Sequence, residues 1–195
     1  MTKQQNATEN LDFQSPTDDT NREGDETAKV EIQIEKIAER QRQITAKIQI
    51  PQPVEQIWKV LTDYEALPDF LPNLAKSRLI EHPNGGIRLE QVGSQRLLNF
   101  KFCARVVLDL EECFPKEINF RMVEGDFKGF SGSWCLEPYS FGEYIGTNLS
   151  YTIQVWPKLT MPVGIIENRL GKDLRLNLLA IHQRVEELAS KEPYV

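Results

Sequence analysis

Residues 163–189 read VGIIENRLGKDLRLNLLAIHQRVEELA, and this stretch decides the fold. Apolar side chains recur in it every three or four residues, which is the spacing of one face of an α-helix. A helix of about 25 residues is roughly 38 Å long, at 1.5 Å per residue. A helix of this length with one apolar face must be covered by a larger surface. The apolar stripe comprises Ile166, Leu170, Leu174, Leu178, Ile181, Val185 and Leu188.

The chain before this helix supplies such a surface as a series of predicted strands. Apolar and polar side chains alternate in residues 99–114, with Phe100, Phe102 and Val106 on one side. Alternation with a period of two is typical of a strand. Short turns separate several such segments, and closely spaced neighbours are expected to pair in an antiparallel sheet. The six predicted strands span residues 74–82, 87–97, 99–114, 117–125, 127–139 and 147–157.

The N-terminal part of the chain consists of a polar, acidic stretch followed by two stretches in which apolar and polar residues alternate. Residues 1–28 are rich in Asn, Gln, Thr, Asp and Glu, and they predict a disordered acidic tail. Residues 29–42 form a strand-like extension, in which residues 30–35 alternate strictly, and alternation returns at residues 44–50. Either one long interrupted strand or a hairpin fits this pattern, and two strand segments are favoured.

Two short helices are expected between the first strand and the rest of the sheet. Pro53 suits the first turn of a helix, and residues 54–64 have helical spacing. A second short turn at residues 64–70 is interrupted by Pro68. The element order predicts an α+β helix-grip fold, with a curved antiparallel sheet of six to seven strands wrapped on the long C-terminal helix. A strongly twisted sheet leaves a gap beneath such a helix, where an apolar ligand could bind.

Two stretches carry a resemblance to a known superfamily. Residues 50–79, IPQPVEQIWKVLTDYEALPDFLPNLAKSRL, and residues 125–138, GDFKGFSGSWCLEP, resemble the START-like or SRPBCC superfamily of polyketide cyclases/dehydrases and lipid transport proteins. Within it, the chain looks most like the coenzyme Q-binding branch, and QVWPKLTMPVG, residues 154–164, is similar to a subset found in cyanobacteria and plastids. The resemblance implies a START-like ligand-binding domain over residues 43–190. It also implies binding of a quinone, sterol, phospholipid, hormone or polyketide intermediate between sheet and helix, with catalysis in a minority of members.

The amino-acid composition limits the kinds of ligand and partner that this chain is expected to bind. A net charge of −6 argues against nucleic acid, because phosphate binding needs a basic surface. Cys103, Cys113 and Cys135 form no C-x-x-C motif, so neither a disulfide framework nor a zinc site is expected. No metal and no cofactor are predicted. The N-terminus lacks the pattern of a secretory signal, and a cytoplasmic location is expected, with a place at the periphery of a membrane as the alternative.

The candidate ligand-binding residues are the large apolar and aromatic side chains of the strand faces, the helix stripe and two proline-bounded loops. Such side chains are more often simple core, and the resemblance is what favours a cavity. The loops contain Phe70–Leu71 and Leu159–Val163, and they form either a permanent lid or a surface that transiently touches a membrane. The predicted ligand contacts are Trp58, Tyr64, Phe70, Leu71, Phe100, Phe102, Val106, Phe120, Phe130, Trp134, Tyr151, Met161, Ile166, Leu170 and Leu174.

Catalytic candidates are few. Glu90, if buried near Arg88, would be an acid or base, but solvated charges across neighbouring strands are the commoner arrangement. Tyr151 either presents its hydroxyl in the cavity or is a core tyrosine. The leading hypothesis is therefore a protein that shelters or transfers an apolar molecule such as a prenylquinone, lipid or isoprenoid. The alternatives are an aromatase/cyclase or dehydratase in the same cavity, and a protein-interaction module.

Overall fold

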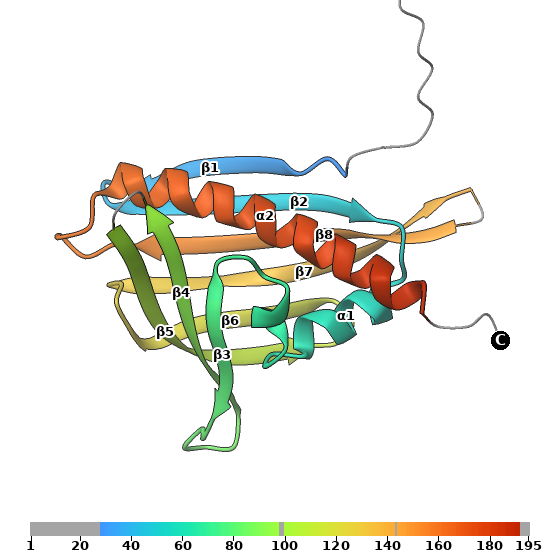
Figure 1. The fold of residues 1–195 in the computed structure, drawn as a ribbon, viewed down its shortest axis with the longest axis horizontal. Coiled ribbons are helices and arrows are strands. Elements are labelled where there is room, and N and C mark those ends of the chain that lie inside the picture. The colour runs from blue at the N-terminus through green and yellow to red at the C-terminus, as the bar shows by residue number, and fades with distance from the viewer. Residues whose placement is uncertain (1–27, 98–99, 143, 192–195) are drawn as a thin grey trace, which may run out of the picture.

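The computed structural model describes residues 28–97, 100–142 and 144–191, and it confirms the predicted α+β helix-grip architecture. One antiparallel sheet carries a long helix across one face (Figure 1). The tail predicted over residues 1–28 lies, apart from Ala28, outside the described residues. The elements are β1 (Glu31–Ala38), β2 (Gln41–Ile50), α1 (Val54–Thr62), the short 3-10 helix η1 (Leu67–Asp69), β3 (Leu74–Ile80), β4 (Ile87–Leu97), β5 (Phe100–Cys113), β6 (Glu117–Gly125), β7 (Gly129–Phe141), β8 (Tyr144–Trp156) and α2 (Val163–Ala189).

The sheet in the described residues has eight strands, in the order β1-β2-β8-β7-β6-β5-β4-β3. The prediction of six to seven strands was therefore too low. Strands β1 and β2 pair antiparallel, with Ile34 opposite Ile44, so the hairpin was the correct alternative for this region. The two short helices consequently follow the second strand rather than the first.

Strand β2 shows how the sequence pattern becomes a core face. Ile44, Ala46, Ile48 and Ile50 are at most 3% exposed, as their alternation predicts. On the opposite face, the hydroxyls of Thr45 and Thr152 hydrogen-bond across β2 and β8 at 3.1 Å. Each strand thus presents one side chain to the helix and the next one to the outer face.

Irregular pairing accompanies the curvature of the sheet. The register between β5 and β6 shifts between Val107 and Leu108, and that between β3 and β4 shifts between Leu74 and Lys76. An extra residue in one strand bends that strand and increases its local twist. The bending helps to carry β3 and β4 out of the plane of the other strands, toward the side that α2 occupies (Figure 1).

Helix α2 has the bounds that its periodicity predicts and packs against β1, β2 and α1. Five residues of the predicted stripe are at most 4% exposed, namely Ile166, Leu174, Leu178, Ile181 and Val185. Leu170 is only partly buried, and Leu188, in the last turn, is 39% exposed. The buried stripe is therefore shorter than predicted.

Candidate ligand-binding site

A cavity of about 200 Å³ lies between the sheet and α2. Its walls come from strands β4 to β8, from α2, and from the segment that joins α1 to β3. Most lining side chains are apolar, because the inward positions of the strands and the stripe of α2 converge there. The predicted contact residues that line it are Tyr64, Leu71, Val106, Phe120, Phe130, Trp134, Tyr151, Ile166, Leu170 and Leu174. Their contact with a ligand stays a prediction.

Three predicted contacts lie elsewhere. Trp58 is 8% exposed and packs edge-on against Phe114, with ring centroids 5.2 Å apart. Phe70 is partly buried beneath the guanidinium of Arg184, which lies 5.8 Å from its ring centroid. Met161 packs against the hydrophobic core without reaching the cavity. The side chains of the two remaining candidates, Phe100 and Phe102, lie outside the described residues.

The proline-bounded loop before α2 is tied to its neighbours by hydrogen bonds. One guanidinium nitrogen of Arg40, Nη2, donates to the carbonyl oxygens of Lys158 and Met161 at 2.9 and 2.8 Å. Leu159 is nevertheless 74% exposed and does not line the cavity. This loop therefore lies beside the site, whereas Leu71 in the other loop forms part of its wall.

Stacked aromatic rings form one wall of the cavity. Trp134 of β7 and Tyr151 of β8 are directly opposite each other in the sheet. Their rings stack with centroids 3.5 Å apart and an interplanar angle of 7°. Phe120 adds a tilted contact, with its centroid 6.1 Å from that of Tyr151. These contacts hold the ring of Tyr151 in one orientation.

Polar side chains gather in the same cavity, and the sequence analysis missed them. Arg169, Asp173 and Asn177 line it from α2, spaced four residues apart. Asn73, before β3, donates from Nδ2 to Oδ1 of Asp173 at 2.8 Å and so bridges to the helix. Their four-residue spacing is the sequence pattern that could have identified this polar cluster, because every fourth residue of a helix falls on nearly the same face. These positions adjoin the apolar stripe, so they share its orientation.

Two tyrosines line the cavity, Tyr64 and Tyr151. The hydroxyl of Tyr64 donates to Oε1 of Glu112 at 2.5 Å, and burial, then that contact, raises its pKa. Burial also raises the pKa of Tyr151, and the carboxylate of Asp173 raises it further. Both phenols are therefore protonated at neutral pH, and the single O–H of Tyr64 is already donated to Glu112.

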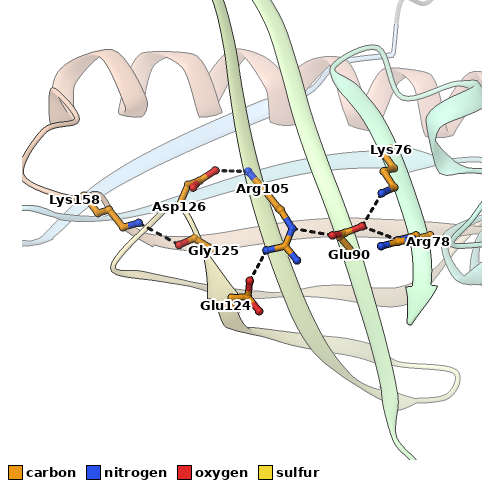
Figure 2. Close-up of polar contacts among 8 residues, drawn as sticks. All are labelled: Lys76, Arg78, Glu90, Arg105, Glu124, Gly125, Asp126 and Lys158. Atoms are coloured by element: carbon orange, nitrogen blue, oxygen red, sulfur yellow. Dashed lines mark hydrogen bonds and ion pairs between the residues drawn. The ribbon is translucent and has the colours of Figure 1, made fainter. Parts of the chain in front are cut away.

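Glu90, the other catalytic candidate, lies outside the cavity. Alternation along β4 directs Leu89 and Gln91 inward, so Glu90 points to the outer face of the sheet. Its carboxylate is bound by Lys76 at 2.8 Å, Arg78 at 2.7 Å and Arg105 at 2.8 Å (Figure 2). These contacts, led by the hydrogen bond from Lys76, lower the pKa of Glu90 to about 2. A carboxylate in this setting ties three strands together and has no access to a ligand in the cavity.

Replacing Glu90 with Gln should destabilise the protein in a pH-dependent way. A carboxyl group whose pKa falls from its ordinary 4.5 to about 2 on folding adds stability at all pH values above about 4.5. That contribution disappears as the pH falls toward 2. Urea denaturation should thus show a larger deficit for Glu90→Gln at pH 6 than at pH 3.

The matched control is Glu124→Gln, which removes a 70% exposed carboxylate from the same arginine, Arg105. Exposed ion pairs contribute little, so this variant should resemble the wild type at both pH values. A deficit for Glu90→Gln that is the same at pH 3 and pH 6 would contradict the electrostatic account.

Neither a metal-binding cluster nor a membrane-spanning helix is found in the described part of the chain. No group of three His, Cys, Asp or Glu side chains is arranged to hold a metal ion there. No helix in those residues is both long enough and apolar enough to cross a bilayer.

Comparison with known proteins gives one family match. A family described as polyketide cyclase / dehydrase and lipid transport matches residues 50–178. The ribosome association toxin RatA of Escherichia coli K12 is 28% identical over 98 residues, which are 50% of this chain and 60% of that protein. The chain thus spans less than two thirds of the length of this relative.

Two solved structures share the fold. An aromatase/cyclase from a Streptomyces species superposes with a TM-score of 0.64 at 16% identity, covering 80% of this chain and 99% of that one. A STAR-related lipid transfer protein from Xanthomonas axonopodis gives a TM-score of 0.58 at 16% identity, covering 80% and 98%. At these identities the likeness concerns the fold alone.

Proposed function

We propose that this chain, which belongs to the polyketide cyclase / dehydrase and lipid transport family, binds one apolar small molecule between its sheet and helix α2. The observation that carries the proposal is the cavity of about 200 Å³ with its mostly apolar and aromatic walls. A core that served stability alone would be filled to the density of an organic crystal, with few voids larger than a water molecule. An apolar occupant removes the deficit in packing and gains the free energy of leaving water.

The size of the cavity favours a compact occupant. An apolar cavity of about 150 Å³ in another protein binds benzene, so about 200 Å³ suits a molecule or head group of one or two rings. A prenylquinone, lipid or isoprenoid would place its ring or terminal segment here. Its remaining chain would need the walls to separate. Sheltering or transferring such a molecule is the role that we propose.

Catalysis in the same cavity, as by a cyclase or dehydratase, is the second candidate, and Tyr151 is the group that favours it. Tyr151 lines the cavity, whereas Glu90 does not. Efficient acid–base catalysis needs a pKa near the operating pH. Burial moves the pKa of Tyr151 upward and away from neutrality, and this supports a binding role over proton transfer.

Two measurements on the full chain test the proposal. Organic extraction of natively purified protein, followed by mass spectrometry, should recover an apolar molecule. Isothermal titration of the extracted protein with naphthalene should show one site per chain. Protein that carries nothing and takes up no naphthalene would rule out a ligand-binding cavity.

A further inference from the structure

Strand β1 forms one edge of the sheet and is exposed along almost its whole length (Figure 1). Among the described residues, β2 is its only neighbour in the sheet, so the outer edge of β1 presents backbone N–H and C=O groups that no strand pairs. Seven of its eight residues are exposed, including Ile34 at 41% and Ile37 at 51%. Such an edge is a template on which another extended segment can pair.

The strand at the other edge, β3, is partly covered by its own chain. The 3-10 helix η1 packs against it, and Oε1 of Glu65 accepts a hydrogen bond from the backbone N–H of Leu79 at 3.1 Å. Lys76 and Arg78 add two charged side chains, which Glu90 of β4 holds in place. A covered and charged edge discourages pairing with another molecule. The two edges therefore differ, and within the described residues only β1 lacks such a cover.

We propose that β1 pairs antiparallel with β1 of a second copy of this chain, centred on Ile34, so that the two sheets join into one. The two-fold axis of such a pair stands perpendicular to the sheet, and residues that face each other therefore lie on the same side of it. Ile34 then faces its own counterpart, Gln33 faces Glu35 of the second copy, and Ile32 faces Lys36 of the second copy. The proposal is independent of what the cavity binds.

The charges along β1 select this register over the two adjacent ones. A pair centred on Gln33 would set Glu31 against Glu35 of the second copy twice, and a pair centred on Glu35 would set that carboxylate against itself. Like charges that face each other across two strands are destabilising. The pair centred on Ile34 has no such contact. It also uses the regular part of β1, because the pairing of β1 with β2 becomes irregular beyond Lys36.

The side chains on both faces of β1 suit this arrangement. On the outer face, Nε2 of Gln33 donates to Oε1 of Glu35 within one strand at 2.6 Å, and the pair sets the same two groups against each other across the axis. On the face that α2 covers, Ile34 lies beside Gly171, and its exposed area would be buried against its own counterpart. Lys36 lays its aliphatic stem on the isoleucine that it faces and keeps its ammonium group in water.

One pair of strands is a small interface, so the dimer is expected to be weak. A stable complex buries about 1,200–2,000 Å² in total, and a single pair of strand edges falls below that range. We therefore expect a dissociation constant on the order of 10–100 µM. Sedimentation velocity of the full chain over a concentration series should show the change from one copy to two. A chain that stays monomeric well above the expected constant would overturn the proposal.

Hydrogen–deuterium exchange, measured by mass spectrometry on the full chain, locates the interface. The amides of β1 should become protected as the concentration rises through the dissociation constant, whereas those of β3 should not change. Protection of β1 that does not depend on concentration would mean that a segment of the same chain covers this edge. That result would also overturn pairing with a second copy.

Ile34→Glu tests the centre of the pair. It sets two carboxylates against each other on the axis and removes the apolar contact, so the dissociation constant should rise at least about tenfold. Leu79→Glu is the matched control, because its side chain is 51% exposed on the other edge strand, and it should leave the dimer unchanged. Equal effects of the two variants would contradict pairing through β1.

Gln33→Lys tests the register and does not depend on whether Ile34→Glu folds. The new side chain faces Glu35 of the second copy, so two pairs of opposite charge form and the dissociation constant should fall about twofold or more. In a pair centred on Gln33 itself, two like charges would meet on the axis and the dimer would weaken. Tighter dimerisation of Gln33→Lys supports the register centred on Ile34, and unchanged or weaker dimerisation overturns it.

Discussion

Truncating Leu178 to alanine is expected to lower the free energy of unfolding by about 2–5 kcal/mol. This is the range for removing a large apolar side chain from a packed core and leaving a cavity. Leu178 is 0% exposed and lies midway along α2 in its buried stripe. The helix cannot move closer to the sheet to fill the void, because the neighbouring stripe residues Leu174 and Ile181 keep it at its present distance. Urea denaturation followed by far-ultraviolet circular dichroism measures the loss.

Leu176→Ala is the matched control on the same helix. Its side chain is 43% exposed, so the identical substitution should change the free energy of unfolding by less than about 0.5 kcal/mol. Equal losses for the two variants would mean that α2 does not pack on the sheet through the stripe that contains Leu178.

Filling the cavity from Ala104 should abolish binding of apolar probes. Ala104 lines the cavity from β5, and Ala104→Phe adds a benzene-sized ring to a space of about 200 Å³. Since about 150 Å³ suffices for benzene, the new ring takes most of the room. We expect the affinity for naphthalene to fall at least about tenfold, with a stability change within the roughly 1–3 kcal/mol typical of enlarged core residues. Titration calorimetry and thermal unfolding measure the two effects.

Cys103→Phe places the same ring one residue earlier, where the side chain is exposed. This control should bind naphthalene as the wild type does. Unchanged binding by Ala104→Phe would show that the probe occupies another part of the protein.

Periodicity predicted most of the fold. The bounds of α2 were correct because a 27-residue helix with one apolar face leaves a long, regular pattern. The β1–β2 hairpin was one of two alternatives, since Glu39 and Arg40 fit either a turn or an interruption within one strand. The consecutive buried residues Val106, Val107 and Leu108 were not anticipated, because a register shift depends on the partner strand as well as on the strand itself.

The candidate site was predictable in its apolar part and not in its polar part. Ten predicted residues converge on the cavity because strand alternation and the helix stripe fix their direction. Asn73 and Asp173 are 100 residues apart, and only the folded chain brings them together. Glu90 could have faced either way until the phase of β4 was known, and that phase follows from its pairing with β3 and β5.

The two strands that pair with β2 are synthesised at different times. Its hairpin partner, β1, is made just before it, but its other partner, β8, follows about 100 residues later, with Ile50 opposite Thr147. At synthesis rates of roughly 5–20 residues per second, that edge of β2 waits on the order of 5–20 s for its partner. The meander from β3 to β8 can assemble locally in the meantime, because each strand pairs with the next. Joining β8 to β2 is therefore the long-range step, and α2, which is made after β8, covers the completed sheet.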